Sequence, residues 1–130
     1  MLPEGIITHR KIIQLQFTDI AGDSYSIAQM DDSYAAVGHC EDVSRTILNS
    51  RLLENAELVS VEALTGSEVW WHVAVGTTDP VSEELTVYDY TARQFSPELP
   101  FPLIQHYDTW VNTVETHAKK GTLAFSELTW

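Results

Sequence analysis

Three consecutive segments with a period of two constrain the fold of this chain most strongly. Residues 56–64 (AELVSVEAL), 69–76 (VWWHVAVG) and 84–91 (ELTVYDYT) are rich in valine, threonine and aromatic residues, and the turn-forming sequences TGSE and TTDPVSE separate them. This alternation predicts β-strands, and the short connections favour antiparallel neighbours. We therefore expect a three-stranded antiparallel sheet over 56–91.

Two segments with helical spacing lie on either side of this sheet in the sequence. From Glu41 to Leu53 the apolar residues recur every three or four positions, and most charged side chains lie opposite them, which predicts an amphipathic helix. A proline-rich stretch at 96–103 leads into a second predicted helix over 104–119, which we expect to cover the sheet. The order of helix, antiparallel sheet and helix favours the α+β class over an alternating parallel arrangement.

The two ends of the chain carry weaker strand patterns. Residues 11–18 (KIIQLQFT) alternate well enough to predict a strand, turn chemistry follows at 21–24 (AGDS), and 123–130 (LAFSELTW) is typical of a closing strand. No repeat, linker or low-complexity tract interrupts the sequence. At 130 residues we expect a single domain over 1–130.

The charge of the chain limits its partners. It carries 19 acidic residues against 7 basic ones, which gives a formal net charge of −12. Such a surface repels polyanions and no basic stripe offsets the repulsion, so we expect neither nucleic acid nor an anionic membrane as a partner. A basic protein partner stays open as an alternative to a merely solvated acidic surface.

The sequence also indicates a compartment. Its start lacks a basic region followed by a long apolar run, and no segment approaches the roughly 18 apolar residues that span a bilayer. The single cysteine excludes an intramolecular disulfide. We expect a cytoplasmic protein, or one delivered by a secretion route that reads no cleavable signal peptide.

That single cysteine, Cys40, lies where a loop becomes the predicted helix, just after Gly38. Unpaired N–H groups and the helix dipole at such a position favour the thiolate form. The spacing from Cys40 to Val43 and Ile47 also places it on the apolar stripe, where a free cysteine serves as a small core residue. The stretch alone leaves both interpretations open.

His72 supplies a candidate base for this thiol. It lies in the middle of an apolar strand, where a buried imidazole needs a hydrogen-bond partner. If 69–76 and 84–91 form a hairpin that is symmetric about 80–81, His72 directly faces Asp89, and facing Cβ atoms lie about 4.5–5.5 Å apart. A slip of one residue would place Asp89 on the opposite face of the sheet.

The small residues Ala74 and Gly76 share the face of His72, so we expect the helix that begins near Cys40 to pack there. The resulting order would be a nucleophile on a helix N-terminus, a base on a strand and an orienting carboxylate on the next strand. Cys40, His72 and Asp89 would then form a catalytic triad.

At this point the residues resemble a family. The small bacterial form of the papain-like fold has Cys, His and Asp sequence blocks that are similar to three segments of this chain. These segments are GHCEDVS with Cys40, WHVAV with His72 and VYDYTARQF with Asp89. That form comprises effector and polymorphic-toxin domains, among them protein glutamine deamidases and cysteine peptidases. The resemblance covers residues 38–95. It implies a helix with an N-terminal cysteine packed on an antiparallel β-sheet, a C-terminal covering helix and a target protein as substrate.

The resemblance leaves the oxyanion donor open. Papain-type peptidases place a glutamine a few residues before the cysteine, and this chain has no amide side chain there. Gln29, eleven residues upstream of Cys40, is the nearest candidate, and the backbone N–H of Cys40 is another. Gln94 lies in DYTARQF, which is similar to the segment that closes the site in those domains, and Trp70 is a candidate wall of the substrate pocket.

The sequence therefore predicts a cysteine-dependent hydrolase acting on amides, most specifically a protein glutamine deamidase of effector or toxin type. A cysteine peptidase or a transglutaminase-like acyl transferase would use the same triad. A non-catalytic acidic binding or immunity-type module is an alternative from another class. We expect no cofactor and no metal, since no His or Cys pair has zinc-ligand spacing. We assign His39 a capping or rim role, and place Trp71 and Trp110 in the core; the oligomeric state stays open.

Overall fold

The computed structural model describes residues 4–65 and 68–119, and the strand predicted at 123–130 lies outside these residues. Helices and antiparallel strands are segregated along the chain, which confirms the α+β class. The elements, in order, are α1 (Glu4–Ile13), β1 (Gln16–Thr18), β2 (Ser24–Ser26), the 3-10 turn η1 (Ile27–Asp31), α2 (Ser33–Ala36), α3 (Cys40–Ser50), β3 (Ala56–Thr65), β4 (Glu68–Thr78), β5 (Leu85–Asp89), the 3-10 turn η2 (Ala92–Gln94), β6 (Leu103–His106) and α4 (Tyr107–Lys119).

The main sheet has the strand order β3-β4-β5-β6, and every neighbouring pair is antiparallel. The three predicted strands correspond to β3, β4 and β5. The fourth strand, β6, occupies residues that the sequence assigned to a proline-rich stretch and to the start of a helix. The predicted helix over 104–119 therefore begins later, at Tyr107.

The prediction of a strand over 11–18 was wrong. Residues up to Ile13 belong to helix α1, and only Gln16–Thr18 are extended, pairing with β2. Ile12 is almost fully buried in the cluster that also holds Ile27 and Met30, so burial on one side of a helix explains the apolar residues as well as alternation does. The turn that follows is stabilised by Asp19, whose carboxylate accepts hydrogen bonds from two backbone N–H groups.

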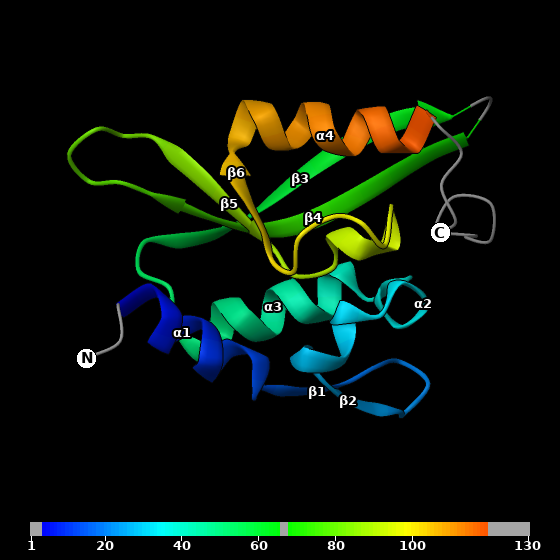
Figure 1. Cartoon of the computed structure of the whole chain (residues 1–130), viewed down its shortest axis with the longest axis horizontal. Coiled ribbons are helices and arrows are strands. Elements are labelled where there is room, and N and C mark those ends of the chain that lie inside the picture. The colour runs from blue at the N-terminus through cyan, green and yellow to red at the C-terminus, as the bar shows by residue number, and fades with distance from the viewer. Residues whose placement is uncertain (1–3, 66–67, 120–130) are drawn as a thin grey trace.

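Helices cover both faces of the main sheet (Figure 1), with α3 on one side and α4 on the other. Val75 of β4 packs in one apolar cluster with Val43 and Ile47 of α3. Ala74 of β4 packs in the other cluster with Trp110 of α4. The core is therefore divided between two layers, one on each side of β4.

This arrangement corrects the expected packing of the cysteine-bearing helix. His72, Ala74 and Gly76 share a face by alternation, and that face is covered by α4 rather than by α3. The space above Gly76 is already filled, because a Cβ atom there would lie 2.7 Å from Val59 Cγ1 and 2.8 Å from Leu85 Cδ1. Gly76 thus admits side chains of the neighbouring strands, whereas Ala74 packs in the cluster of α4.

No helix within residues 4–65 and 68–119 is both long enough and apolar enough to cross a membrane.

Candidate active site

Cys40 is the first residue of α3 and is 2% exposed. Gly38 precedes it with a φ of +79°, a left-handed conformation that glycine adopts without strain and that turns the chain into the helix. The helix contributes unpaired N–H groups in its first turn, since its first intrahelical bond runs from the N–H of Val43 to the carbonyl of His39.

His39 occupies the N-cap position of α3, although its side chain turns away from the helix. Its Nδ1 lies 2.7 Å from the carbonyl oxygen of Ala35, and its Nε2 lies 3.2 Å from Oδ2 of Asp19. Both partners are hydrogen-bond acceptors, and together they fix the orientation of the ring. A hydrogen bond from the Asp23 backbone holds the pKa of Asp19 below its ordinary value, and His39 lowers it further.

His72 and Asp89 make a hydrogen bond, but not as a facing pair. The pairs of β4 with β5 run from Thr78↔Leu85 to Val75↔Tyr88, and continuing this register sets Asp89 opposite Ala74. The predicted register was therefore wrong by two residues. A shift of two keeps Asp89 on the face of His72, and Nε2 of His72 reaches Oδ2 of Asp89 across the diagonal at 2.7 Å.

Asp89 is 1% exposed, and donors surround both of its oxygens. Besides His72, the indole Nε1–H of Trp110 donates to Oδ2 at 2.9 Å. The backbone N–H and the hydroxyl of Thr91 donate to Oδ1 at 3.0 and 3.3 Å. Burial by itself would raise the pKa of this carboxyl, but the charge and hydrogen bond of His72 lower it on balance.

The imidazole of His72 is fully buried, with Phe95 edge-on at 4.6 Å between ring centroids. Burial disfavours its charged form, yet the charge and hydrogen bond of Asp89 raise the pKa of His72 to about 10. Cys40 raises that pKa further through hydrogen bonding and charge, although α3 packs on the other face of the sheet. The hydrogen bonds of the two ring nitrogens themselves go to Asp89 at Nε2 and to Gln94 at Nδ1.

Gln94 is fully buried and meets the other nitrogen of that ring, since its Nε2 lies 2.8 Å from Nδ1 of His72. Among the described residues, Oε1 of Gln94 has no hydrogen-bond partner. In the orientation given, Gln94 donates to a neutral ring; turning the amide would let Oε1 accept from an imidazolium. We refer to Cys40, His72, Asp89 and Gln94 as the buried cluster.

The remaining predicted site residues lie apart from the buried cluster or outside the description. Gln29 is exposed, and its Oε1 accepts a hydrogen bond from the Ser26 backbone at 2.8 Å in a capping box. The side chain of Trp70 lies outside the described residues. Trp71, expected in the core, is 56% exposed, because it lies on the α3 face beyond the part that the helix covers.

The sequence interpretation missed two partners of the Asp89 carboxylate. Trp110 was expected only as a core residue, although a buried indole N–H ordinarily finds an acceptor, and this rule was the available signal. Thr91 follows Asp89 by two residues, the spacing at which an aspartate accepts from the backbone ahead of it. Both residues hold the carboxylate in place.

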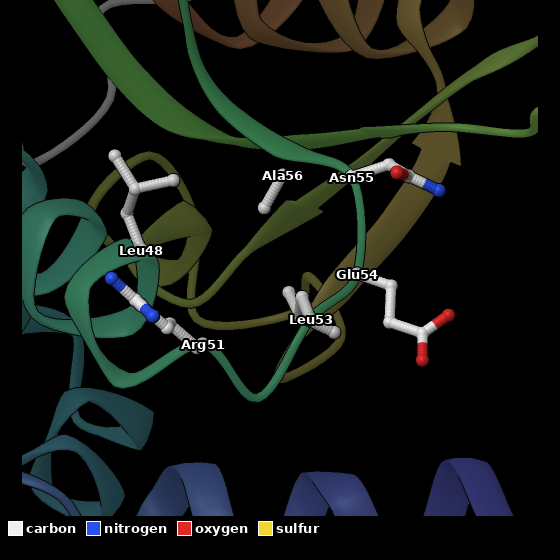
Figure 2. A pocket seen from close by; sticks show the side chains of 6 residues that line it. All are labelled: Leu48, Arg51, Leu53, Glu54, Asn55 and Ala56. Atoms are coloured by element: carbon white, nitrogen blue, oxygen red, sulfur yellow. The ribbon is translucent and has the colours of Figure 1, made fainter.

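The buried cluster is closed to solvent, since each of its four residues is 2% exposed or less. A cavity of about 480 Å³ at the far end of α3 is lined by Leu48, Arg51, Leu53, Glu54, Asn55 and Ala56 (Figure 2). Two others, of about 670 and 230 Å³, adjoin α1 and the first turns of α3. None of these three cavities is lined by the cluster. Within the described ranges, no three His, Cys, Asp or Glu side chains are grouped to hold a metal ion.

No protein-family model, curated protein or solved structure matches this chain. The site is therefore defined by its own geometry: an α+β domain with a buried thiol, imidazole and carboxylate, and with an amide on the second nitrogen of the imidazole. Such a set holds the imidazole in one orientation, with a carboxylate on Nε2 and an amide on Nδ1.

Proposed function

We propose that this protein is a cysteine-dependent hydrolase of papain-like type that acts on amides, with the side-chain carboxamide of a glutamine in a target protein as the favoured substrate. One observation carries the proposal. Asp89 orients His72 through a 2.7 Å hydrogen bond, and the thiol of Cys40 raises the pKa of the same ring. This is the relation among nucleophile, base and orienting carboxylate that thiol catalysis requires.

The proposed reaction has two steps. The sulfur of Cys40 attacks the carboxamide carbon, and His72 donates its proton to the departing nitrogen, so that ammonia leaves and a thioester forms. His72 then takes a proton from a water molecule, and the resulting hydroxide attacks the thioester carbon. The carbon–sulfur bond breaks, His72 returns its proton to the departing sulfur, and the products are a glutamate side chain and the free thiol of Cys40.

Charge that develops on the carboxamide oxygen needs donors close to the sulfur. Cys40, Glu41 and Asp42 open α3, and their backbone N–H groups precede the first intrahelical bond, from Val43 N–H to the carbonyl of His39. We assign the oxyanion position to these groups, with the amide of Gln94 as an additional donor when it turns away from His72.

The burial of the cluster favours a second candidate, a non-catalytic acidic binding module. In that case the hydrogen bonds among His72, Asp89 and Gln94 are core interactions, and Cys40 is a packing residue. The two candidates differ in the reactivity of the thiol, because a structural buried cysteine is inert whereas a catalytic one forms a thiolate near neutral pH.

Iodoacetamide separates these candidates cleanly, because the chain has one cysteine and all alkylation reports on Cys40. For the hydrolase we expect alkylation at pH 6, well below the ordinary thiol pKa of about 8.5, and a slower rate in Asp89→Asn. Candidate target proteins are then incubated with the native chain or with Cys40→Ala and examined by mass spectrometry. A gain of about 1 Da at a glutamine, absent with Cys40→Ala, supports deamidation, whereas cleavage or a new covalent partner indicates the peptidase or the transferase. An inert thiol at pH 6–8 together with an unchanged target contradicts the hydrolase.

A further inference from the structure

A small groove lies on the α3 face of the sheet, beside the first two turns of α3. Its volume is about 230 Å³, and its walls come from α3, β3 and β4. The lining includes Glu41, Arg45, Leu58, Ser60, Trp71 and Val73. Trp71 and Val73 flank His72 in β4 but point to the opposite face, so the groove is separate from the buried cluster.

Trp71 is the most distinctive group of this groove. It is 56% exposed, and it lies in the part of β4 that pairs with β3 alone, so one side of the indole is open. It pairs directly with Glu62 of β3, which is also exposed, so the Cβ atoms of the two residues lie about 4.5–5.5 Å apart on the same face. An open indole and an acidic side chain therefore stand next to each other on one surface.

The two glutamates beside the groove differ in whether they form an ion pair. Glu41 accepts a hydrogen bond from Nε of Arg45 at 2.9 Å, so these two groups form an ion pair at the rim. Glu62 takes part in no ion pair with any other described residue. Its carboxylate is available to a cation that comes from another molecule.

We propose that this groove binds an arginine side chain of a basic segment in a partner protein. The guanidinium would lie over the indole of Trp71, where the ring quadrupole attracts a cation, and would direct its N–H groups to the carboxylate of Glu62. The net charge of −12 favours the approach of such a basic segment. The inference does not depend on catalysis by the buried cluster, because no residue of that cluster lines the groove.

The probe for this site is a pentapeptide amide in which glycines separate two arginines, and its matched control replaces both arginines with neutral citrulline. ¹H–¹⁵N spectra of the chain are recorded during titration, and the indole signal of Trp71 is identified by its loss in Trp71→Leu. We expect the arginine peptide to shift that signal saturably, and the citrulline peptide to bind at least about threefold more weakly.

Two variants test the assignment of residues. Glu62→Gln and Trp71→Leu should each weaken binding of the arginine peptide by about three- to fivefold. Glu57→Gln is the matched control, since Glu57 is an exposed glutamate of the same strand that pairs with Gly76 on the other face, and it should change the affinity less than twofold. Equal binding of the two peptides, or an equal loss in Glu57→Gln and Glu62→Gln, would overturn the proposal in favour of general charge attraction. Tighter binding of a lysine peptide than of the arginine peptide would also overturn the proposal. So would chemical-shift changes that are confined to residues of the cavity beside α1.

Discussion

The buried pair of His72 and Asp89 makes the stability of this protein depend on pH above neutrality. The pKa of His72 is about 10 in the folded chain, against 6.5 ordinarily, so the folded chain keeps a proton that the unfolded chain releases. The stability contributed by this proton is complete below pH 6.5 and is lost as the pH rises through about 10. Linkage gives a decrease of about 3 kcal/mol in the free energy of unfolding between pH 6 and pH 9. Asp89 acts in the opposite sense: its pKa is lowered, so its contribution is present above its ordinary pKa of 3.8 and is lost as the pH falls further.

Urea unfolding, followed by tryptophan fluorescence at pH 6, 7, 8 and 9, measures this dependence. Asp89→Asn removes the charge that raises the pKa of His72, so the unfolding free energy of this variant should be lower by about 3–5 kcal/mol at pH 6 and nearly independent of pH up to 9. Asp31→Asn changes an exposed carboxylate and should keep both the stability and the slope of the native chain.

A second measurement covers the case in which Asp89→Asn does not fold. The ¹⁵N shifts of the His72 ring in the native chain should show both nitrogens protonated at pH 8, with the Gln94 amide turned so that its Oε1 accepts from Nδ1–H. An unfolding free energy that stays constant from pH 6 to 9, or a His72 ring that is neutral at pH 7, would refute the reasoning. Either result means that the Asp89 carboxylate raises the pKa of His72 by less than burial lowers it.

Four further substitutions, one of them a control, have definite expected outcomes. Gly76→Ala should lower the unfolding free energy by about 1–3 kcal/mol, since two neighbouring side chains must move. Its control is Gly5→Ala, which has no atom within 4 Å of the added carbon and should be neutral or stabilising. Equal urea midpoints for these two variants would contradict the packing around Gly76. Trp110→Phe should lower the unfolding free energy by about 1 kcal/mol by removing one donor to the carboxylate of the buried cluster, and an unchanged midpoint in urea would mean that this bond contributes nothing. Gln94→Ala should speed alkylation of Cys40 by iodoacetamide at pH 7 by about threefold or more, because it frees one nitrogen of the imidazole, and a slower rate would mean that the amide assists the thiol instead.

The strands of the sheet were predictable because each carries a sustained pattern. Residues 56–64, 69–76 and 84–91 alternate over long runs, and a period of two leaves no helical alternative that buries the same side chains. The register was harder, because loop residues determine where the hairpin turns, and the actual pairing differs from a turn centred on 80–81 by two positions. The face of the sheet on which Asp89 lies was still predicted correctly, because only a shift by an odd number of residues moves a side chain to the other face.

Other features depend on contacts that no local pattern carries. The alternation in 11–18 suits either a strand or one side of a helix, and the burial of Ile12 beside Ile27 and Met30 decides for the helix. The side of the sheet that α3 covers was equally undetermined, since both faces of β4 are apolar. Side chains from β3 and β5 fill the space above Gly76, and this information is distributed over three strands.

The position of the buried cluster follows from where β5 stops pairing with β4. Their pairing ends at Val75 and Tyr88, and after Asp89 the chain leaves the sheet for η2. His72 therefore lies in a part of β4 that has lost one neighbouring strand, and side chains of the departing segment take its place: Gln94 bonds the ring and Phe95 packs against it. A sheet that opens at one edge leaves buried polar groups to be satisfied by side chains rather than by a ladder of backbone bonds. One change in strand pairing therefore requires the polar cluster, to which Cys40, the nucleophile that we propose, also belongs.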